Sequence, residues 1–167
     1  MSDPLVFDAD YSGDRAPDMT VRLTFEQRSK ARLRVQTGDG QAIGLFVERG
    51  RVLRGGSRLT GPAGKVLQID AAPEKVSLVR ADASSTDPRL DLTRAAYHLG
   101  NRHVALQVEP EGLVYQADRV LDEMVAGLGL AVEQEEAPFE PEAGAYSSHD
   151  SHGSRAHSHS HDHNAHS

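Results

Sequence analysis

The sequence predicts an α+β protein made of three consecutive segments. Short alternating apolar runs separated by glycines extend from Asp18 to Ile69 and indicate a small all-β domain over residues 1–72. Strand and helix patterns then follow one another over residues 73–146 in the order βαββαβ. The last segment, residues 147–167, is polar and rich in histidine, with nothing apolar to bury. Such a composition predicts a disordered tail.

The composition excludes several classes of function. The chain has 167 residues and no cysteine, which excludes disulfides, thiolate nucleophiles and cysteine-based zinc or iron–sulfur sites. Any metal chemistry must therefore use nitrogen and oxygen ligands. The net charge is −7 and, although Arg28 to Arg34 is locally basic, there is no dense cluster of Lys and Arg. These features argue against a nucleic-acid partner.

The amino terminus carries no sign of a targeting segment. Met1 to Pro4 lacks the basic and apolar regions of a signal peptide, and no run approaches the roughly 18 apolar residues that a bilayer-spanning helix needs. We therefore expect a cytoplasmic protein without a membrane partner.

In the first segment, period-2 alternation predicts the strands. Leu33 and Val35 lead into a Gly-containing turn at residues 37–40, after which the alternation resumes, so this part is expected to form a hairpin. Two glycine patterns, at 38–44 and 61–65, lack the spacing of nucleotide-binding loops and are interpreted as turns. Residues 70–73 are interpreted as a linker. The expected strands span residues 21–25, 33–35, 43–47, 51–53 and 66–69.

The second segment begins with a strand and a well-marked helix. Residues 75–80 alternate, with Val76 and Leu78 on one face of the strand. Asp87 is an expected N-cap, and Pro88 stands at the first helical position. The apolar stripe of this helix, which Gly100 and Asn101 end, consists of Leu92, Ala95, Ala96 and Leu99.

The same segment continues with two strands, a second helix and a last strand. Residues 104–108 alternate as a strand, and a turn at Glu111 and Gly112 leads into the next strand at 113–115. Asp118 caps a helix whose stripe reaches Leu128, and a final strand begins at Leu130. The order βαββαβ is that of the split-βαβ, ferredoxin-like arrangement, in which two helices cover one face of a four-stranded antiparallel sheet and leave the other face open.

The histidine-rich tail is the first candidate for metal binding. It holds seven of the nine histidines. Imidazole has an unperturbed pKa of about 6.5, so near neutral pH most rings offer a lone pair to Ni²⁺, Cu²⁺ or Zn²⁺. A tail that must become ordered on binding favours weak, multiple and labile sites. The interruptions by Ser, Asp, Ala and Asn favour native metal binding over a purification tag or a solubility tail. The candidate ligands here are His149, His152, His157, His159, His161, His163 and His166.

Two histidines, His98 and His103, lie before the tail. In a strand from His103 to Glu109, the side chains at 103, 105 and 107 should point to the open face of the sheet. One ring on an open sheet is a poor site, but near the axis of a two-fold homodimer it meets its own copy and becomes two ligands. His98 lies off the apolar stripe of its helix, and is either a second ligand or a solvated ring.

Two runs resemble a known family. Ala96 to Val104 (AYHLGNRHV) looks like the signature of the UreE urease accessory proteins, and Pro138 to Tyr146 (PFEPEAGAY) closely resembles the segment that precedes their histidine-rich tail. The resemblance implies a two-domain nickel metallochaperone, with an N-terminal domain similar to a peptide-binding module of heat-shock chaperones. It also implies a homodimer whose central nickel is held by His103 of each subunit. Residues 117–119 (ADR) stand where some members carry a His-x-His pair.

The functional hypothesis combines these observations. The tail captures Ni²⁺, the His103 pair holds one ion, and the ion passes on by ligand exchange. The resemblance implies that an accessory GTPase and the urease apoprotein complex are the partners. Copper generally outcompetes nickel at such ligands, so Cu²⁺ or Zn²⁺ can bind in vitro, and nickel must be favoured by availability and partners. No histidine stands beside a nucleophile, so an enzyme is not expected. Two alternatives stay open: a metal storage or buffering protein, and a peptide-binding adaptor without a metal role.

Overall fold

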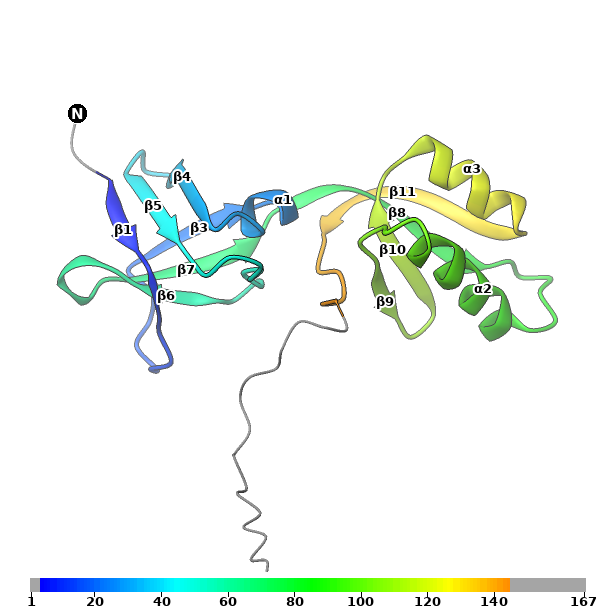
Figure 1. Ribbon diagram of the computed structural model, residues 1–167, viewed down its shortest axis with the longest axis horizontal. Coiled ribbons are helices and arrows are strands. Elements are labelled where there is room, and N and C mark those ends of the chain that lie inside the picture. The colour runs from blue at the N-terminus through cyan, green and yellow to red at the C-terminus, as the bar shows by residue number, and fades with distance from the viewer. Residues whose placement is uncertain (1–3, 145–167) are drawn as a thin grey trace, which may run out of the picture.

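The computed structural model describes residues 4–144, which form two units side by side, with α1 and the end of β11 between them (Figure 1). We call residues 4–72 the N-terminal unit and residues 73–144 the C-terminal unit. The elements are β1 Leu5–Phe7, β2 Ala9–Asp10, β3 Met19–Leu23, α1 Phe25–Arg28, β4 Arg32–Gln36, β5 Ala42–Phe46, β6 Arg58–Thr60, the 3-10 turn η1 Pro62–Gly64, β7 Val66–Ala71, β8 Pro73–Ala81, α2 Pro88–Gly100, β9 Gln107–Glu109, β10 Gly112–Gln116, α3 Arg119–Gly127 and β11 Leu130–Pro138.

The N-terminal unit contains two sheets with one apolar core. The strand orders are β1-β5-β4 and β2-β6-β7-β3. The predicted hairpin is confirmed: β4 pairs antiparallel with β5, with Leu33 opposite Leu45, and Gly40 takes the positive φ of 86° that the turn requires. Side chains from both sheets meet in the core, whose fully or nearly buried members are Phe7, Val21, Leu23, Ile43, Leu45, Leu53, Leu59, Leu67 and Ile69.

Several expectations for this unit were wrong in detail. Phe25 does not extend a strand, because Thr24 forms a capping box with Gln27 and starts the short helix α1. Leu53 is buried as its pattern predicts, but it lies in a loop rather than a strand. Residues 70–73 are not a linker. β7 and β8 are separated by Ala72 alone, so the chain passes from one unit to the other almost without interruption.

The C-terminal unit has the predicted βαββαβ order. Its sheet runs β11-β8-β10-β9, and every neighbouring pair is antiparallel. Both helix starts are as predicted: the Asp87 carboxylate accepts a hydrogen bond from the Leu90 N–H, and the Asp118 carboxylate accepts from Val120 and Leu121. The helices α2 and α3 cover one face of this sheet (Figure 1).

The opposite face of the sheet is not open, which corrects the prediction. Val76, Leu78 and Val114 lie there, and the chain turns back after β11 to place Phe139 over them with no exposed surface. These three side chains would otherwise meet water, so covering them with an aromatic ring is favourable by the hydrophobic effect. We call residues 139–142 the return segment.

A polar network ties α3 to the sheet. The Tyr115 hydroxyl donates to the Asp122 carboxylate at 2.8 Å, and the Gln134 amide donates to its other oxygen at 2.7 Å. Partial burial pushes the pKa of Asp122 upward, but hydrogen bonds from the surrounding polar side chains outweigh it and hold this pKa below its usual value. Asp122 is therefore more favourable as a carboxylate in the folded protein than in the unfolded chain.

Tyr115→Phe tests this network. Removal of the hydroxyl should lower the free energy of unfolding at pH 7 by about 1.5–3 kcal/mol, which is typical of a hydrogen bond to a charged group. Because the folded-state pKa is depressed, the stabilisation is present above the unfolded-state pKa of about 3.9 and is lost as the pH falls through the lower folded-state pKa. Urea denaturation at a series of pH values should show the difference between the two proteins shrinking in acid. A constant difference would contradict the proposed role of Asp122.

Candidate metal centre

His103 lies in the turn that ends α2, and not on a strand as predicted. The His103 N–H donates to the Gly100 carbonyl at 2.9 Å, and the Val104 N–H donates to the Leu99 carbonyl at 3.3 Å. This pair of hydrogen bonds is the Schellman pattern of helix ends. β9 begins only at Gln107, so the pleat argument for the direction of the His103 side chain does not apply.

The backbone of His103 is in the left-handed region, with φ of 57°. The Schellman pattern requires this conformation at one residue, and Gly or Asn usually occupies that position. A residue with a Cβ atom pays roughly 1–2 kcal/mol there. The chain therefore carries an exposed imidazole at a position where glycine would be less strained. Such an outlier points to a functional reason for the side chain.

The side chains after His103 point alternately to the two faces of the sheet, as predicted, although these residues do not pair as a strand. Val104 and Leu106 pack against the core under the helices, whereas Ala105 packs on the other face with the cluster around Phe139. The alternation in the sequence was therefore correct, and only its assignment to a strand was wrong. We call residues 103–106 the histidine loop.

The return segment holds the far end of the histidine loop. The Glu142 N–H donates to the Leu106 carbonyl at 2.8 Å, and the Glu140 N–H donates to the Gln107 side-chain oxygen at 2.7 Å. From the sequence, residues 138–146 were predicted only to connect the domain to the tail. Their hydrogen bonds to the histidine loop were not predicted. The signal in the sequence was the alternation of apolar residues at Phe139 and Pro141, both of which are buried in the structure.

His98 is exposed on α2, as its position off the apolar stripe predicts. Its ring meets that of Tyr97 edge to face, with ring centres 5.4 Å apart. Within residues 4–144, no hydrogen bond or ion pair engages the ring of His98 or of His103. Each ring is thus free to offer a nitrogen lone pair.

In the described part of the chain, no three side chains of His, Asp or Glu gather into a group that could hold an ion. The remaining candidate ligands, namely His149, His152, His157, His159, His161, His163 and His166, lie outside the described residues. Residues 117–119, where the family resemblance suggests a His-x-His pair, are Ala, Asp and Arg here, and Asp118 acts as the N-cap of α3.

Comparison with known proteins identifies the family. The model of the UreE urease accessory protein N-terminal domain matches residues 8–72, and that of the C-terminal domain matches residues 74–166. The chain belongs to the UreE family. These are accessory proteins and not enzymes, so the expectation of a protein without catalytic activity is confirmed.

Individual relatives agree with this result. A urease accessory protein UreE of Pseudomonas putida W619 is 59% identical over 130 residues, which cover 77% of this chain and 78% of the relative. UreE of Saccharophagus degradans is 46% identical over 148 residues, covering 89% of this chain and 85% of the relative. Among residues 4–144 of this UreE protein, no helix is long and apolar enough to cross a bilayer.

His103→Gly tests the strain at the end of α2. Glycine adopts a positive φ without a Cβ clash, so the free energy of unfolding of the metal-free protein should rise by about 0.5–1 kcal/mol. The matched control is His98→Gly, in the body of the same helix, which should lower that free energy by about 1 kcal/mol. Urea denaturation in the presence of a chelator measures both. A loss of stability in His103→Gly equal to that of the control would contradict the assignment.

Proposed function

We propose that this protein is a metallochaperone that captures Ni²⁺ in the cytoplasm and delivers it for assembly of the urease metallocentre. The observation that carries the proposal is His103, an exposed imidazole without a partner in residues 4–144, kept at a strained helix end. The names of the relatives supply the urease connection, since each is called a urease accessory protein. Ni²⁺ is the cargo, and imidazole nitrogen suits it as a ligand.

A homodimer would complete the site. One imidazole gives a weak site, whereas two copies of His103 near a two-fold axis give two ligands to one ion. The end of α2 offers apolar surface for such a contact, because Tyr97 is 66% exposed there. His98 lies on the same turn of helix and is a candidate for a further ligand.

Two imidazoles leave coordination positions open, and the tail can supply the missing ligands. The hydrogen bond from Glu142 to Leu106 ties the return segment, which precedes the tail in the chain, to the histidine loop. The seven residue steps from Glu142 to His149 can span at most about 25 Å when extended. We infer that tail histidines capture ions and hand them to His103 by ligand exchange. A bare ion is then never required.

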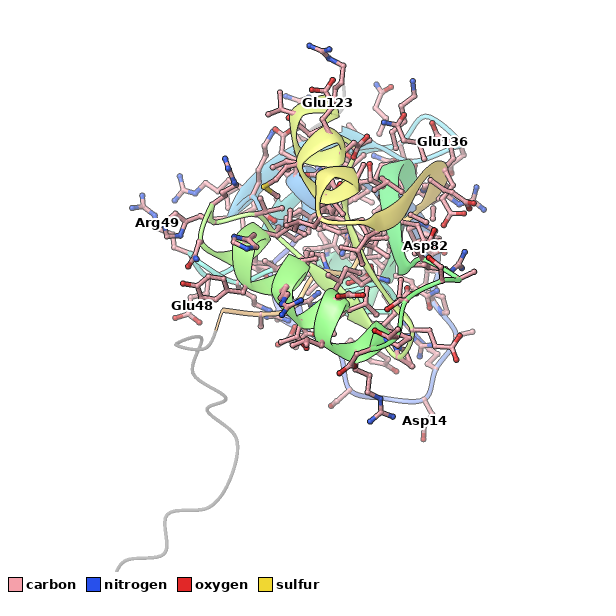
Figure 2. All side chains as sticks on the ribbon, turned by 90° about the vertical axis from the view of Figure 1, so that its right-hand side faces the viewer. Asp14, Glu48, Arg49, Asp82, Glu123 and Glu136 are labelled. Carbon is pink, nitrogen blue, oxygen red and sulfur yellow. The ribbon has the colours of Figure 1, made fainter. Side chains whose placement is uncertain are left out.

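The charge of the C-terminal unit favours a cationic cargo. Residues 73–144 contain 14 Asp or Glu and six Lys or Arg. Figure 2 shows acidic side chains such as Asp82, Glu123 and Glu136 projecting outward around the layer of helices. A negative field raises the local concentration of cations and speeds their arrival.

Delivery requires partners. We propose that the protein acts with the accessory GTPase of the urease maturation system and with the urease apoprotein complex, whose ligands replace those of the chaperone. Two rival functions make different predictions. A storage or buffering protein would need only the tail, and a peptide-binding adaptor would need no metal ligand at all.

A nickel titration separates these functions. The chain ending at Tyr146 should bind about one Ni²⁺ per dimer, because two His103 rings make one site. His103→Asn, which tolerates the positive φ, should abolish that binding, and His98→Asn shows whether the histidine on α2 adds a further ligand. Calorimetry gives the number of ions, and light scattering gives the mass in solution.

The outcomes distinguish the three functions. Loss of nearly all binding on removal of the tail alone would favour a buffer over a chaperone. For the adaptor, urease activation in a reporter cell should survive removal of the tail and His103 together. If the chain with His103 intact binds nickel while it remains a monomer, the proposal of a site shared by two subunits is wrong.

A further inference from the structure

One buried arginine forms hydrogen bonds to both units. Arg28, the last residue of α1, has no exposed surface. Its guanidinium donates to the carbonyls of Leu23 and Leu53 at 3.1 Å each, both within the N-terminal unit. It also donates across to the Phe139 carbonyl at 2.5 Å and pairs with the Glu140 carboxylate at 3.1 Å. Arg28 thus holds the return segment from the side of the N-terminal unit.

Neighbouring contacts strengthen the same junction. The Gly55 N–H donates to Glu140 at 2.7 Å, and Arg54 donates to the Pro141 carbonyl at 2.6 Å. A Cβ atom at position 55 would lie 2.9 Å from the Glu140 carboxylate, so only glycine allows this approach without a shift. The Phe25 and Phe139 rings pack edge to face beside these polar contacts.

The other side of the return segment holds the histidine loop. Glu140 and Glu142 donate their backbone N–H groups to Gln107 and Leu106, as described above. These bonds fix the loop only three residues beyond His103. An unbroken series of short contacts therefore runs from Arg28 in the N-terminal unit, through the return segment, to the loop that carries the candidate ligand.

We propose that Arg28 is a positioning residue for His103, so that the N-terminal unit sets the nickel affinity of the C-terminal unit. This inference rests on the proposed nickel site and deepens it. The physical reason is that removal of a fully buried guanidinium affects every group that it bonds to. Its loss leaves the Phe139 carbonyl and the Glu140 carboxylate without their buried partner. The return segment then loosens, and the loop end held by Glu142 loosens with it.

The test uses the full chain with the seven tail histidines replaced by asparagine, so that nickel binding reports on the folded part. In this parent, Arg28→Gln should weaken nickel binding about fivefold, a typical size for coupling through such a network. The amide proton of Glu142 should exchange roughly tenfold faster in the metal-free protein, because its bond to Leu106 opens more often. Calorimetry and NMR hydrogen exchange measure the two effects.

Two further variants keep the test sharp. Gln107→Leu removes the acceptor for Glu140 from the loop side, and it should weaken nickel binding in the same direction even if Arg28→Gln does not fold. Ile43→Ala opens a cavity in the N-terminal core away from the return segment and controls for a general loss of stability. Its nickel affinity should equal that of the parent.

The inference is overturned if both Arg28→Gln and Gln107→Leu keep the nickel affinity of the parent within twofold. It is also overturned if Ile43→Ala loses as much affinity as they do. If the parent itself binds no nickel, the proposed function fails, and hydrogen exchange alone decides the inference. Faster exchange at Glu142 in Arg28→Gln then supports the link from Arg28 to the loop, and unchanged exchange refutes it.

Discussion

The arrangement of the protein depends on the buried guanidinium of Arg28. It is surrounded by carbonyl oxygens from Leu23, Leu53 and Phe139, residues that lie 5, 25 and 111 positions away in the chain. A charge without access to water is tolerated only when its hydrogen-bonding groups are satisfied. The fork of Arg can serve several acceptors at fixed angles, which Lys cannot do. This one side chain therefore brings the end of α1, the loop before β6 and the return segment to a common point.

The return segment makes this junction relevant to the candidate site. Phe139 closes the face of the sheet that the βαββαβ order would leave open, and the backbone at Glu140 and Glu142 reaches the histidine loop. The covalent connection at Ala72 joins the units only at one edge. A second connection through the return segment restricts their relative movement, because rotation about a single peptide would break the bonds to Arg28. The return segment and the end of the histidine loop are consequently held together.

Local chemistry allowed the sequence to predict much of this fold. Capping at Asp87 and Asp118, and the alternation of Val104 and Leu106, act over a few residues and were read correctly. The part that could not be predicted depends on distant contacts. Nothing in the locally basic run that begins at Arg28 distinguishes a buried arginine from a solvated one. The turn at His103 was not predicted, because the alternating residues after it also fit a strand. In the structure Val104 packs against the core under the helices, and its N–H bonds to Leu99 at the end of α2.

The strain at His103 finally constrains what the residue does. The left-handed conformation is fixed by the two hydrogen bonds that end α2, and any side chain at this position inherits it. A strained residue persists when the surrounding structure over-determines its conformation. Within residues 4–144 the imidazole gains no hydrogen bond, ion pair or burial that would offset the cost. Within the described residues the two hydrogen bonds of the helix end therefore offset the strain, and the ring itself stays exposed, as the proposed metal ligand would need.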